Sequence, residues 1–545
     1  MKFEEALSVA QADMLQGRVL KSSISSGLTD LVERLGTDWF SALLRPLLLT
    51  FPDNPIELQL HVAHREPMPI GSTALEVHPD EAVSLINISG DASLKTVRRL
   101  VSIPSADVLD EVSAFRFVNA DGGLRRRIGD LYTFLYRKTP LALDLWRQST
   151  NDRRGWDTSL DDEEKVDAPP KRFETTGEST PTAWFALHWL EAGGAESWAF
   201  ESIRLAKDAG YEIVITVDQA APQRMLSKAL ELSDHVYLGA NALSLDDWKR
   251  FLPALVATHN FQLLHIHHSA RAYEFLPVLK QLVPDVVVID STHIIEHRTG
   301  GFVRMSLLHS EFIDLHHLIS PQLRDEYLLS NEIPPEKVLY APLTQMEQQE
   351  INNDQIVLRD AGEPLRIGFL GRLAAQKRPF LFVELVRRLN KKYPGRFVFV
   401  MQGSGALVNF VDEQIKDFGL EDVIERREWG PVDEFFDSID VLLVTSDNEG
   451  LTLTALEADA HQVLVASADV GSQITVVAPE VLFPRYPIGF LTAATTALSE
   501  LAVNPDAYRH ALEHQRDLHN RLRQLESASS YFTRFYAQQF SKVLP

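Results

Sequence analysis

Short apolar runs alternate with amphipathic stretches from about residue 182 to the end of the chain. Runs such as Trp184–Leu190 and Val441–Thr445 are typical of buried strands, and the stretches between such runs have helical spacing. A repeating order of strand and helix predicts parallel strands joined by crossover helices. We therefore predict an α/β protein with two Rossmann-like domains at residues 182–345 and 365–525, joined by a polar hinge at 346–364.

The first 150 residues have a different pattern. Residues 1–50 favour helix, Ile56–Val62 alternates like a half-buried strand, and Asn119–Gly123 is a strong turn signal. We expect residues 1–150 to form an additional α+β or β-rich accessory domain that either binds a second substrate, the acceptor, or mediates assembly. Arg125–Arg127 follow the turn, and they either contact a phosphate-bearing acceptor lipid or a partner, or form a solvated charge run.

The segment 151–181 is rich in Asp, Glu, Lys, Thr and Pro, which favours a linker. Its acidic run Asp161–Glu164 is more typical of a solvated linker than of a metal site.

Composition narrows the function. The 545 residues suffice for about three domains, and the chain contains no cysteine, which excludes disulfides and thiolate chemistry. The start lacks a signal-peptide pattern, and no apolar run reaches about 20 residues, so we expect a cytoplasmic protein. A net charge of -23 argues against nucleic-acid binding. Local contact with a membrane surface or a partner protein stays open.

Two glutamates stand beside a predicted helix entrance. Val441–Thr445 is followed by a turn at Gly450 and a helix predicted at Leu451–Asp459. Glu449 and Glu457 would lie roughly 12 Å apart at about 1.5 Å per residue, which suits a ligand with a sugar, a diphosphate and a ribose. Free N–H groups near Gly450 and Leu451 favour an anion there. The alternative is a pair of solvated charges.

A second motif lies upstream, where a strand runs into a turn at Gly371 and a helix opens near Pro379. Arg372 and Lys377 flank this turn. Two cations beside a helix start can neutralise a diphosphate leaving group without a metal. The alternative is that both are ordinary surface charges.

These motifs, together with Gly193-Gly194 after the first strand, make residues 181–545 resemble the retaining GT-B glycosyltransferases of family 4, the glycosyl transferases group 1. The resemblance implies a GT-B fold of two Rossmann-like domains facing across a cleft, with the last helix, at 526–545, returning to the N-terminal half. It also implies transfer from a nucleoside diphosphate sugar with retention of anomeric configuration.

The resemblance assigns roles to single residues. Arg372 and Lys377 match the diphosphate-binding pair, Glu449 the sugar-contacting glutamate and Glu457 the ribose-binding one. His293 matches a histidine near the donor sugar that hydrogen-bonds or orients it. The predicted catalytic residues are thus Glu449, His293, Arg372 and Lys377, and the predicted donor-binding residues are Gly193, Gly194, Gly371, Arg372, Lys377, Gly450, Leu451 and Glu457.

Other features carry weaker signals. His267 is a minor candidate for the site. His293 and His297 have a spacing that could bind zinc on a helix, but no HExxH motif and no third ligand accompany them, so we predict no metal. Arg298–Arg304 is expected to be a loop by the cleft that steers acceptor, or a plain surface loop. The segment Glu428–Gly430 corresponds to the base-contacting region of the family.

The predicted reaction is metal-independent hexosyl transfer from a donor such as a UDP- or GDP-sugar, with no other cofactor. The acceptor is a glycan, a lipid-linked glycan or a protein, in cell-surface polysaccharide or glycoconjugate synthesis. An alternative is a non-catalytic glycosyltransferase-like subunit that chaperones an active partner. Sugar-nucleotide epimerisation would need acid/base carboxylates that we do not identify. Donor sugar, base, acceptor and oligomeric state stay open.

Overall fold

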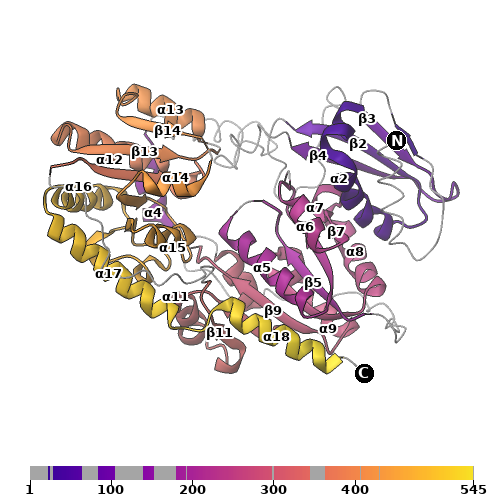
Figure 1. The fold of residues 1–545 in the computed structure, drawn as a ribbon. Helices are drawn as coiled ribbons and strands as arrows, with labels where there is room; N and C mark the ends of the chain where they lie inside the picture. Colours follow the sequence, from indigo (N-terminus) through magenta and orange to yellow (C-terminus); the bar gives the residue numbers. More distant parts are fainter. Residues whose placement is uncertain are drawn as a thin grey trace.

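The computed structural model describes residues 22–24, 29–63, 84–104, 135, 139–151, 180–191, 193–221, 223–296, 300–343, 362–405, 407–428 and 430–543. Several predictions lie outside these ranges: Asn119–Gly123, Arg125–Arg127, Asp161–Glu164, His297, Arg298, Trp429 and residues 344–361. The described chain forms an N-lobe (180–343) and a C-lobe (362–523), with an N-terminal sheet at the far end of the N-lobe (Figure 1).

The N-lobe contains one parallel sheet in the order β11-β10-β9-β8-β5-β6-β7. Its strands are β5 (Thr182–Leu187), β6 (Glu212–Val217), β7 (His235–Tyr237), β8 (Phe261–His267), β9 (Val287–Thr292), β10 (Leu315–Leu318) and β11 (Val338–Tyr340). Its helices are α5 (Gly194–Asp208), α6 (Leu226–Leu232), α7 (Gly239–Ala242), α8 (Leu245–Thr258), α9 (Ala270–Leu282), α10 (Gly301–Leu308) and α11 (Pro321–Asp325).

Both faces of this sheet are buried, as expected for parallel strands covered by crossover helices. Along β5, Trp184 and Ala186 enter one apolar cluster, whereas Phe185 and Leu187 enter another. The alternation follows from the opposite orientation of successive strand side chains. A continuous apolar run therefore became a central strand.

The C-lobe contains a second parallel sheet in the order β14-β13-β12-β15-β16-β17. Its strands are β12 (Leu365–Leu370), β13 (Phe397–Gln402), β14 (Ile424–Arg427), β15 (Val441–Val444), β16 (Leu464–Ala468) and β17 (Leu482–Phe483). Its helices are α12 (Pro379–Lys392), α13 (Val408–Asp417), α14 (Val432–Asp437), α15 (Leu453–Ala460), α16 (Pro487–Val503) and α17 (Pro505–Arg523). The two Rossmann-like lobes confirm the predicted α/β architecture.

In each sheet the strand order reverses beside the first strand. β5 lies between β6 and β8 in the N-lobe, and β12 lies between β13 and β15 in the C-lobe. Loops diverge at the carboxyl ends of such neighbouring strands and leave a crevice, where open parallel sheets bind ligands. The loops after β12 and β15 carry Lys377 and Glu449, so both residues lie at this reversal.

The N-terminal region forms a smaller sheet in the order β1-β3-β2-β4, with β2 and β4 parallel and the other pairs antiparallel. Its elements are β1 (Ser22–Ile24), α2 (Thr29–Thr50), β2 (Ile56–Ala63), β3 (Ser84–Ile88), β4 (Val97–Pro104) and α4 (Pro140–Asn151). α2 packs on α7 and α8 of the N-lobe. Arg99 Nε on β4 donates to Asp247 Oδ2 on α8 at 2.7 Å.

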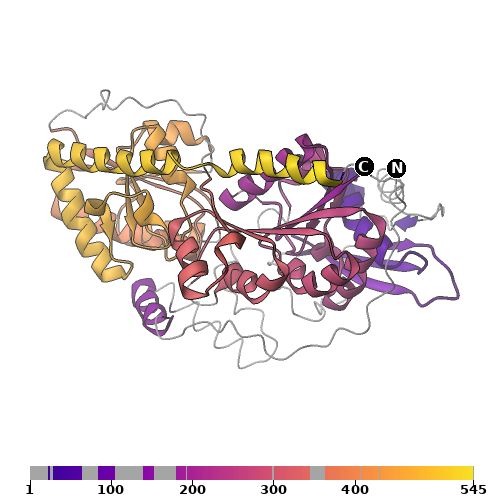
Figure 2. The ribbon, with the colours of Figure 1, turned by 90° about the horizontal axis from the view of Figure 1, so that it is seen from below.

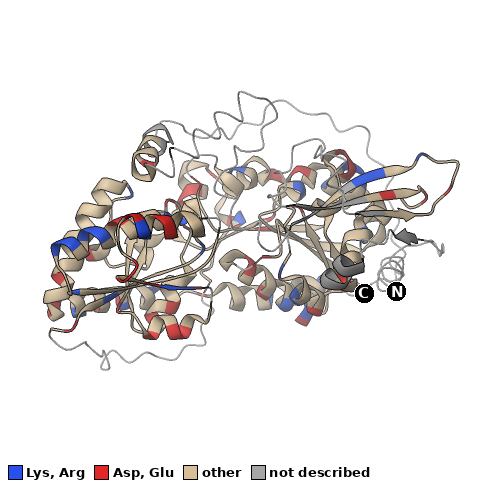
Figure 3. Ribbon diagram, turned by 90° about the horizontal axis from the view of Figure 1, so that it is seen from above, with Lys and Arg blue, Asp and Glu red and all other residues tan. Residues whose placement is uncertain are grey.

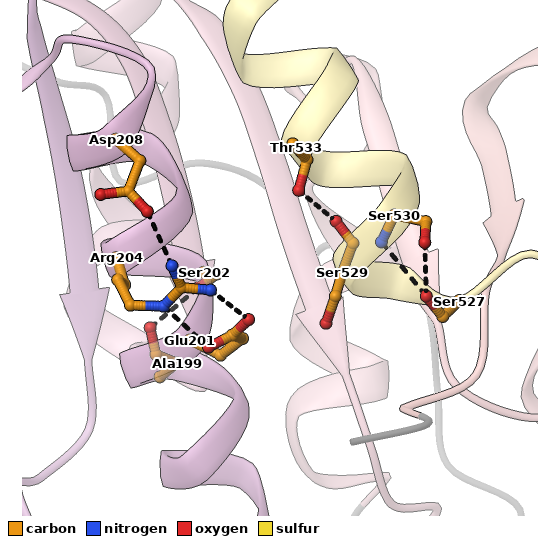
Figure 4. A network of polar contacts seen from close by, with 9 residues as sticks. All are labelled: Ala199, Glu201, Ser202, Arg204, Asp208, Ser527, Ser529, Ser530 and Thr533. Carbon is orange, nitrogen blue, oxygen red and sulfur yellow. Dashed lines mark hydrogen bonds and ion pairs between the residues drawn. The ribbon is translucent and has the colours of Figure 1, made fainter. Parts of the chain in front are cut away.

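The chain crosses from the C-lobe back to the N-lobe near its C-terminal end. α17 lies on the C-lobe, and α18 (Ala528–Val543) continues along the N-lobe against α5 (Figure 2). Figure 4 shows α18 starting beside α5, with Ser527 Oγ accepting from the Ser530 amide at 3.1 Å. Tyr536 then reaches the sheet, where its hydroxyl lies 2.6 Å from His265 Nδ1.

Charged residues of both signs are interspersed over the two lobes, and β4 carries a basic pair in the N-terminal sheet (Figure 3). Among the described helices, none combines the length and the apolar character needed to cross a membrane.

Candidate functional site

The lobes meet at the carboxyl ends of their sheets. A Cβ atom at Gly450, in the loop after β15, would come within 1.8 Å of the carbonyl oxygen of His293, which follows β9. A Cβ atom at Gly194, at the start of α5, would lie 3.0 Å from Leu453 Cδ1 on α15. Predicted site residues from both lobes therefore line one interface.

Backbone contacts fasten the loop after β12 to the loop after β15. The Thr445 hydroxyl donates to the carbonyl oxygen of Lys377 at 2.6 Å. The Asp447 amide donates to the Gln376 carbonyl at 2.8 Å, and the Gln376 side chain donates to the Asn448 carbonyl at 3.0 Å. These bonds hold the two loops in register without help from the N-lobe.

The register brings Lys377 and Glu449 together. Lys377 Nζ lies 2.6 Å from Glu449 Oε1, and the two side chains are 26% and 8% exposed. An ion pair this sheltered from water is stronger than one at the surface. The predicted phosphate-binding cation and the predicted sugar-binding carboxylate thus form an ion pair with each other.

Arg372 occupies the rim of the same interface. Its side chain is exposed, and its guanidinium carbon lies 5.8 Å from the ring centre of Trp189 in the N-lobe. Gly371, just before it, has φ 148°, and a Cβ atom at Gly403 would come within 2.0 Å of the Gly371 carbonyl oxygen. Glycines thus let the loops after β12 and β13 pack against each other.

The helix after Glu449 begins later than predicted. α15 starts at Leu453, and Gly450 and Leu451 belong to the preceding loop. Leu451 is buried, so its apolar character reflects packing and not helix formation. The free helix N–H groups consequently lie from Leu453 onward, and the predicted 12 Å separation along a helix axis does not apply to Glu449.

Glu457 lies in α15, half-buried. Burial raises the pKa of its carboxyl, the charge of Asp433 on α14 raises it further, and His461 works in the opposite direction. α14 begins two residues after Gly430, whose carbonyl oxygen accepts from Gln402 Nε2 at 3.1 Å. Glu457 therefore lies close enough to Asp433 and His461 for their charges to act on it.

A hollow of about 800 Å³ lies beside the predicted base-contacting segment, along β14 and α13. It is lined by Gly403, Ser404, Val408, Asp412, Ile415, Glu421, Ile424, Arg426, Arg427 and Glu428.

The N-lobe contributes the loop after β5. This strand ends at Leu187 and not at Leu190 as predicted, which places His188 and Trp189 at the interface. Trp189 Nε1 donates to Glu196 Oε1 at 2.5 Å, and His188 Nε2 lies 3.2 Å from the same oxygen. A Cβ atom at Gly193 would lie 2.2 Å from Glu196 Oε2, so a larger residue there would displace the Glu196 carboxylate.

Glu196 is strongly acidic in this setting. Burial alone would raise the pKa of its carboxyl, but the hydrogen bond and charge of His188 and the hydrogen bond of Trp189 lower it to about 2. Asp218, at the end of β6, behaves in the opposite way. Burial raises the pKa of Asp218 to about 6, despite bonds from the Arg271 amide and the Ser269 hydroxyl.

His293 is buried at the lobe interface, and its Nε2 atom has no hydrogen-bond partner in the described structure. Burial lowers the pKa of His293 well below its usual value, and the nearby His268 and His267 lower it further. The ring of His268 lies 5.0 Å from that of His293 and stacks on Phe302. A neutral imidazole suits the predicted hydrogen-bonding role.

His267 has a structural role. His267 Nε2 lies 3.0 Å from Ser202 Oγ inside the N-lobe, so it belongs to the core. The described residues contain no group of side chains able to hold a metal ion. His293 follows a strand and is not on a helix, which contradicts the geometry that a zinc site with His297 requires.

The predicted loop at Arg298–Arg304 is partly wrong. Gly300 and Gly301 have positive φ angles of 75° and 52°, and α10 begins at Gly301. The two glycines form a tight entry to a helix, and Arg304 lies on that helix.

Sequence reasoning missed His188, Trp189 and Asp218. Each directly follows or closely follows a buried strand, and polar or aromatic residues at strand ends of a parallel sheet were the available signal.

Comparisons with known proteins agree with this geometry. Residues 350–503 match the family described as Glycosyl transferases group 1, and this part of the chain includes Arg372, Lys377, Glu449 and Glu457. The chain therefore carries a glycosyltransferase group 1 domain. No curated protein matches its sequence.

Sucrose-phosphate synthase (tll1590) from Thermosynechococcus elongatus is similar in structure, with a TM-score of 0.51 and 17% identity over 67% of this chain and 100% of that one. The apo lipopolysaccharide outer core galactosyltransferase WaaB gives 0.48 and 14% over 66% and 99%. Anabaena Alr3699/HepE with UDP-glucose gives 0.46 and 14% over 66% and 99%. The first likeness shows the shared GT-B fold.

Proposed function

We propose that this protein is a retaining glycosyltransferase that uses a nucleoside diphosphate sugar. The observation that carries the proposal is the sheltered Lys377–Glu449 pair at the strand-order reversal of the C-lobe, in a loop that contacts His293 of the other lobe. Support also comes from the group 1 domain, which spans Arg372, Lys377, Glu449 and Glu457.

In the proposed complex the ion pair opens. Lys377 turns to the diphosphate and Glu449 accepts hydrogen bonds from the sugar hydroxyls. Arg372 approaches the diphosphate from the rim, and the free N–H groups at the start of α15 face the same charge. Fixed donors of this kind stabilise the charge that develops on a leaving diphosphate. Glu457 binds the ribose.

The N-lobe supplies the acceptor side in this proposal. His293 donates or accepts a hydrogen bond near the reacting carbon, and the loop containing Gly193 and Gly194 closes over the diphosphate. Closure of the lobes excludes water and limits donor hydrolysis. The acceptor attacks the sugar from the face that the diphosphate leaves, and the leaving phosphate takes the proton of the acceptor hydroxyl. We propose a glycan, lipid-linked glycan or protein acceptor, no metal, and a cytoplasmic location.

The first test is binding. The purified protein is titrated with UDP, GDP and ADP and their sugar conjugates, and thermal stability is followed. A ligand at a hundredfold excess over Kd stabilises the native state by about 2.7 kcal/mol.

The second test is donor hydrolysis, measured as release of free nucleoside diphosphate. Glu449→Ala and Lys377→Ala should each lose at least about a hundredfold in rate. Glu413→Ala and Lys391→Ala remove exposed charges of the same signs in the same lobe and serve as controls. If the unchanged protein binds the nucleotide but neither it nor any variant hydrolyses the donor, the non-catalytic subunit is favoured instead.

A further inference from the structure

Helix α4 lies on the C-lobe, although it follows the N-terminal sheet in sequence. It packs against α12 and α16, and Figure 1 shows it among the C-lobe elements. α2 and β4, from the same N-terminal region, contact the N-lobe instead. The described N-terminal region therefore touches both lobes, and its C-lobe contact is the one near the donor residues.

The contact includes a buried ion pair. Arg378 Nη1 donates to Asp144 Oδ2 of α4 at 3.3 Å, and the two side chains are 1% and 4% exposed. Burial lowers the pKa of Arg378, and the charge of Asp144 works most strongly against that change. A buried charge is costly unless it is paired and fully hydrogen-bonded, and Asp144, followed by Asp447, supplies the opposite charge that stabilises the Arg378 cation.

The backbone of Arg378 is itself unusual. Its φ and ψ angles of 46° and 54° lie in the left-handed region, which is unfavourable for a residue with a side chain. Such a conformation persists where surrounding contacts enforce it. Here Nε donates to the Thr445 carbonyl at 2.6 Å, Nη2 to the Ser446 carbonyl at 2.7 Å and Nη1 to the Arg485 carbonyl at 2.9 Å.

Those bonds reach the two segments that carry Lys377 and Glu449. Arg378 directly follows Lys377, and Thr445 and Ser446 lead into the loop that carries Glu449. The guanidinium thus adds two bonds to those that already join the end of β15 to the turn before α12. Asp144 supplies the carboxylate that pairs with that guanidinium, although it is 234 residues away in the chain.

We infer that Asp144 is a positioning residue of the donor site, which acts through Arg378 to hold Lys377 and Glu449 in register. The inference rests on the proposed function. The N-terminal region thereby supports the donor site, because a nucleoside diphosphate is bound tightly only while α4 packs on the C-lobe. Asp144 itself does not touch the donor.

The test uses the full chain and the nucleoside diphosphate, UDP or GDP, that the unchanged protein binds more tightly. Asp144→Asn removes the charge and keeps the shape. We expect its Kd for the nucleotide to rise at least about tenfold, and the KM for the donor sugar nucleotide in hydrolysis to rise with it. Circular dichroism and the unfolding temperature report whether the variant is folded.

Arg378→Gly supplies a second route, because glycine adopts the left-handed conformation without strain and the change removes the guanidinium through which Asp144 is proposed to act. This variant should also bind the nucleotide more weakly than the unchanged protein. Adding Asp144→Asn to it should change the Kd by less than about twofold, because the two residues act through one contact. A general loss of stability would instead make the two effects on nucleotide affinity add.

Asp247→Asn is the matched control. It removes the acid of the Arg99–Asp247 pair, which joins the N-terminal region to the N-lobe away from the donor residues. Its nucleotide Kd should stay within about twofold of the unchanged protein. A folded Asp144→Asn that binds the nucleotide normally would overturn the inference and leave the proposed function standing. Failure of the unchanged protein to bind any nucleoside diphosphate would overturn the proposed function, and the inference with it.

Discussion

Gly450 of the C-lobe packs directly on the carbonyl group of His293 in the N-lobe, so closely that a Cβ atom would lie 1.8 Å from the oxygen. Gly450 is not among the glycines with positive φ. Alanine could adopt its backbone conformation, so the obstacle to a side chain is contact between lobes and not local strain.

Gly450→Ala should therefore hold the lobes apart. We expect donor hydrolysis and transfer to fall about a hundredfold, because a displacement of about 1 Å at a reacting centre has that effect. Nucleotide affinity should change little, since most of the proposed contacts to the diphosphate come from the C-lobe. Gly489→Ala, in α16, is the control. Normal rates in Gly450→Ala would show that the contact is not needed for reaction.

Lys377→Ala should destabilise the protein as well as slow it. The change leaves Glu449, whose side chain is 8% exposed, without its cation. Leaving such a group unpaired costs about 1–3 kcal/mol, measured by urea unfolding. Lys280→Ala breaks the pair with Asp314, whose side chain is 50% exposed, and should cost less than about 1 kcal/mol. Equal losses in the two variants would mean that the Lys377–Glu449 pair is not effectively sheltered.

Asp218 should weaken the fold as pH rises. Its folded pKa, about 6, lies above the ordinary 3.8. Folding thus favours the protonated form, and its contribution is complete below about pH 3.8 and is lost as pH rises through about 6. Asp218→Asn should gain stability relative to the unchanged protein across this window, by about 3 kcal/mol at most. Urea unfolding at several pH values measures the difference, and a flat difference would contradict the shift.

Glu196 should show the opposite dependence. Its folded pKa of about 2 lies below the ordinary 4.5, so its contribution is present above about pH 4.5 and is lost as pH falls toward 2. The stability advantage over Glu196→Gln should reach about 3 kcal/mol near pH 5 and shrink on acidification. The same unfolding series tests this, with Asp218→Asn as the control of opposite sign. An advantage that grows on acidification would refute the prediction.

His293 should stay neutral throughout the physiological range, because its pKa is lowered well below 6.5 by burial and by neighbouring histidines. We expect His293→Ala to lose about a hundredfold or more in transfer rate. Between about pH 6 and 8, the plot of transfer rate against pH should have the same shape in the unchanged protein and in His293→Ala, because His293 does not titrate there. A limb of this plot that disappears with His293 would show that the imidazole titrates in the working enzyme.

The sequence predicted the elements that local pattern determines. The apolar run before Glu449 became β15, and Pro379 became the first residue of α12, as its fixed φ angle favours. The motif residues Lys377 and Glu449 came together because the loops that carry them follow neighbouring parallel strands. Leu451 misled the prediction of the helix start because a buried apolar residue in a loop has the same signature as one in a helix.

Contacts between distant segments could not be predicted from the local sequence pattern. No signal near Asp144 indicates Arg378, and no spacing rule connects Trp189 with Arg372. Strand order is another such property, because alternating strands and helices predict a parallel sheet without fixing where the order reverses. The position of the site in the fold therefore came from tertiary structure, and its residue types came from the sequence.

The chain returns from the C-lobe to the N-lobe between α17 and α18. The Ala528 amide, at the start of α18, donates to the Pro342 carbonyl of the N-lobe at 3.0 Å. Because this bond and the packing on α5 hold α18 on the N-lobe, rotation of the lobes relative to each other must bend the short stretch 524–527. A protease cut in that stretch would leave α18 attached to the N-lobe by its non-covalent contacts alone.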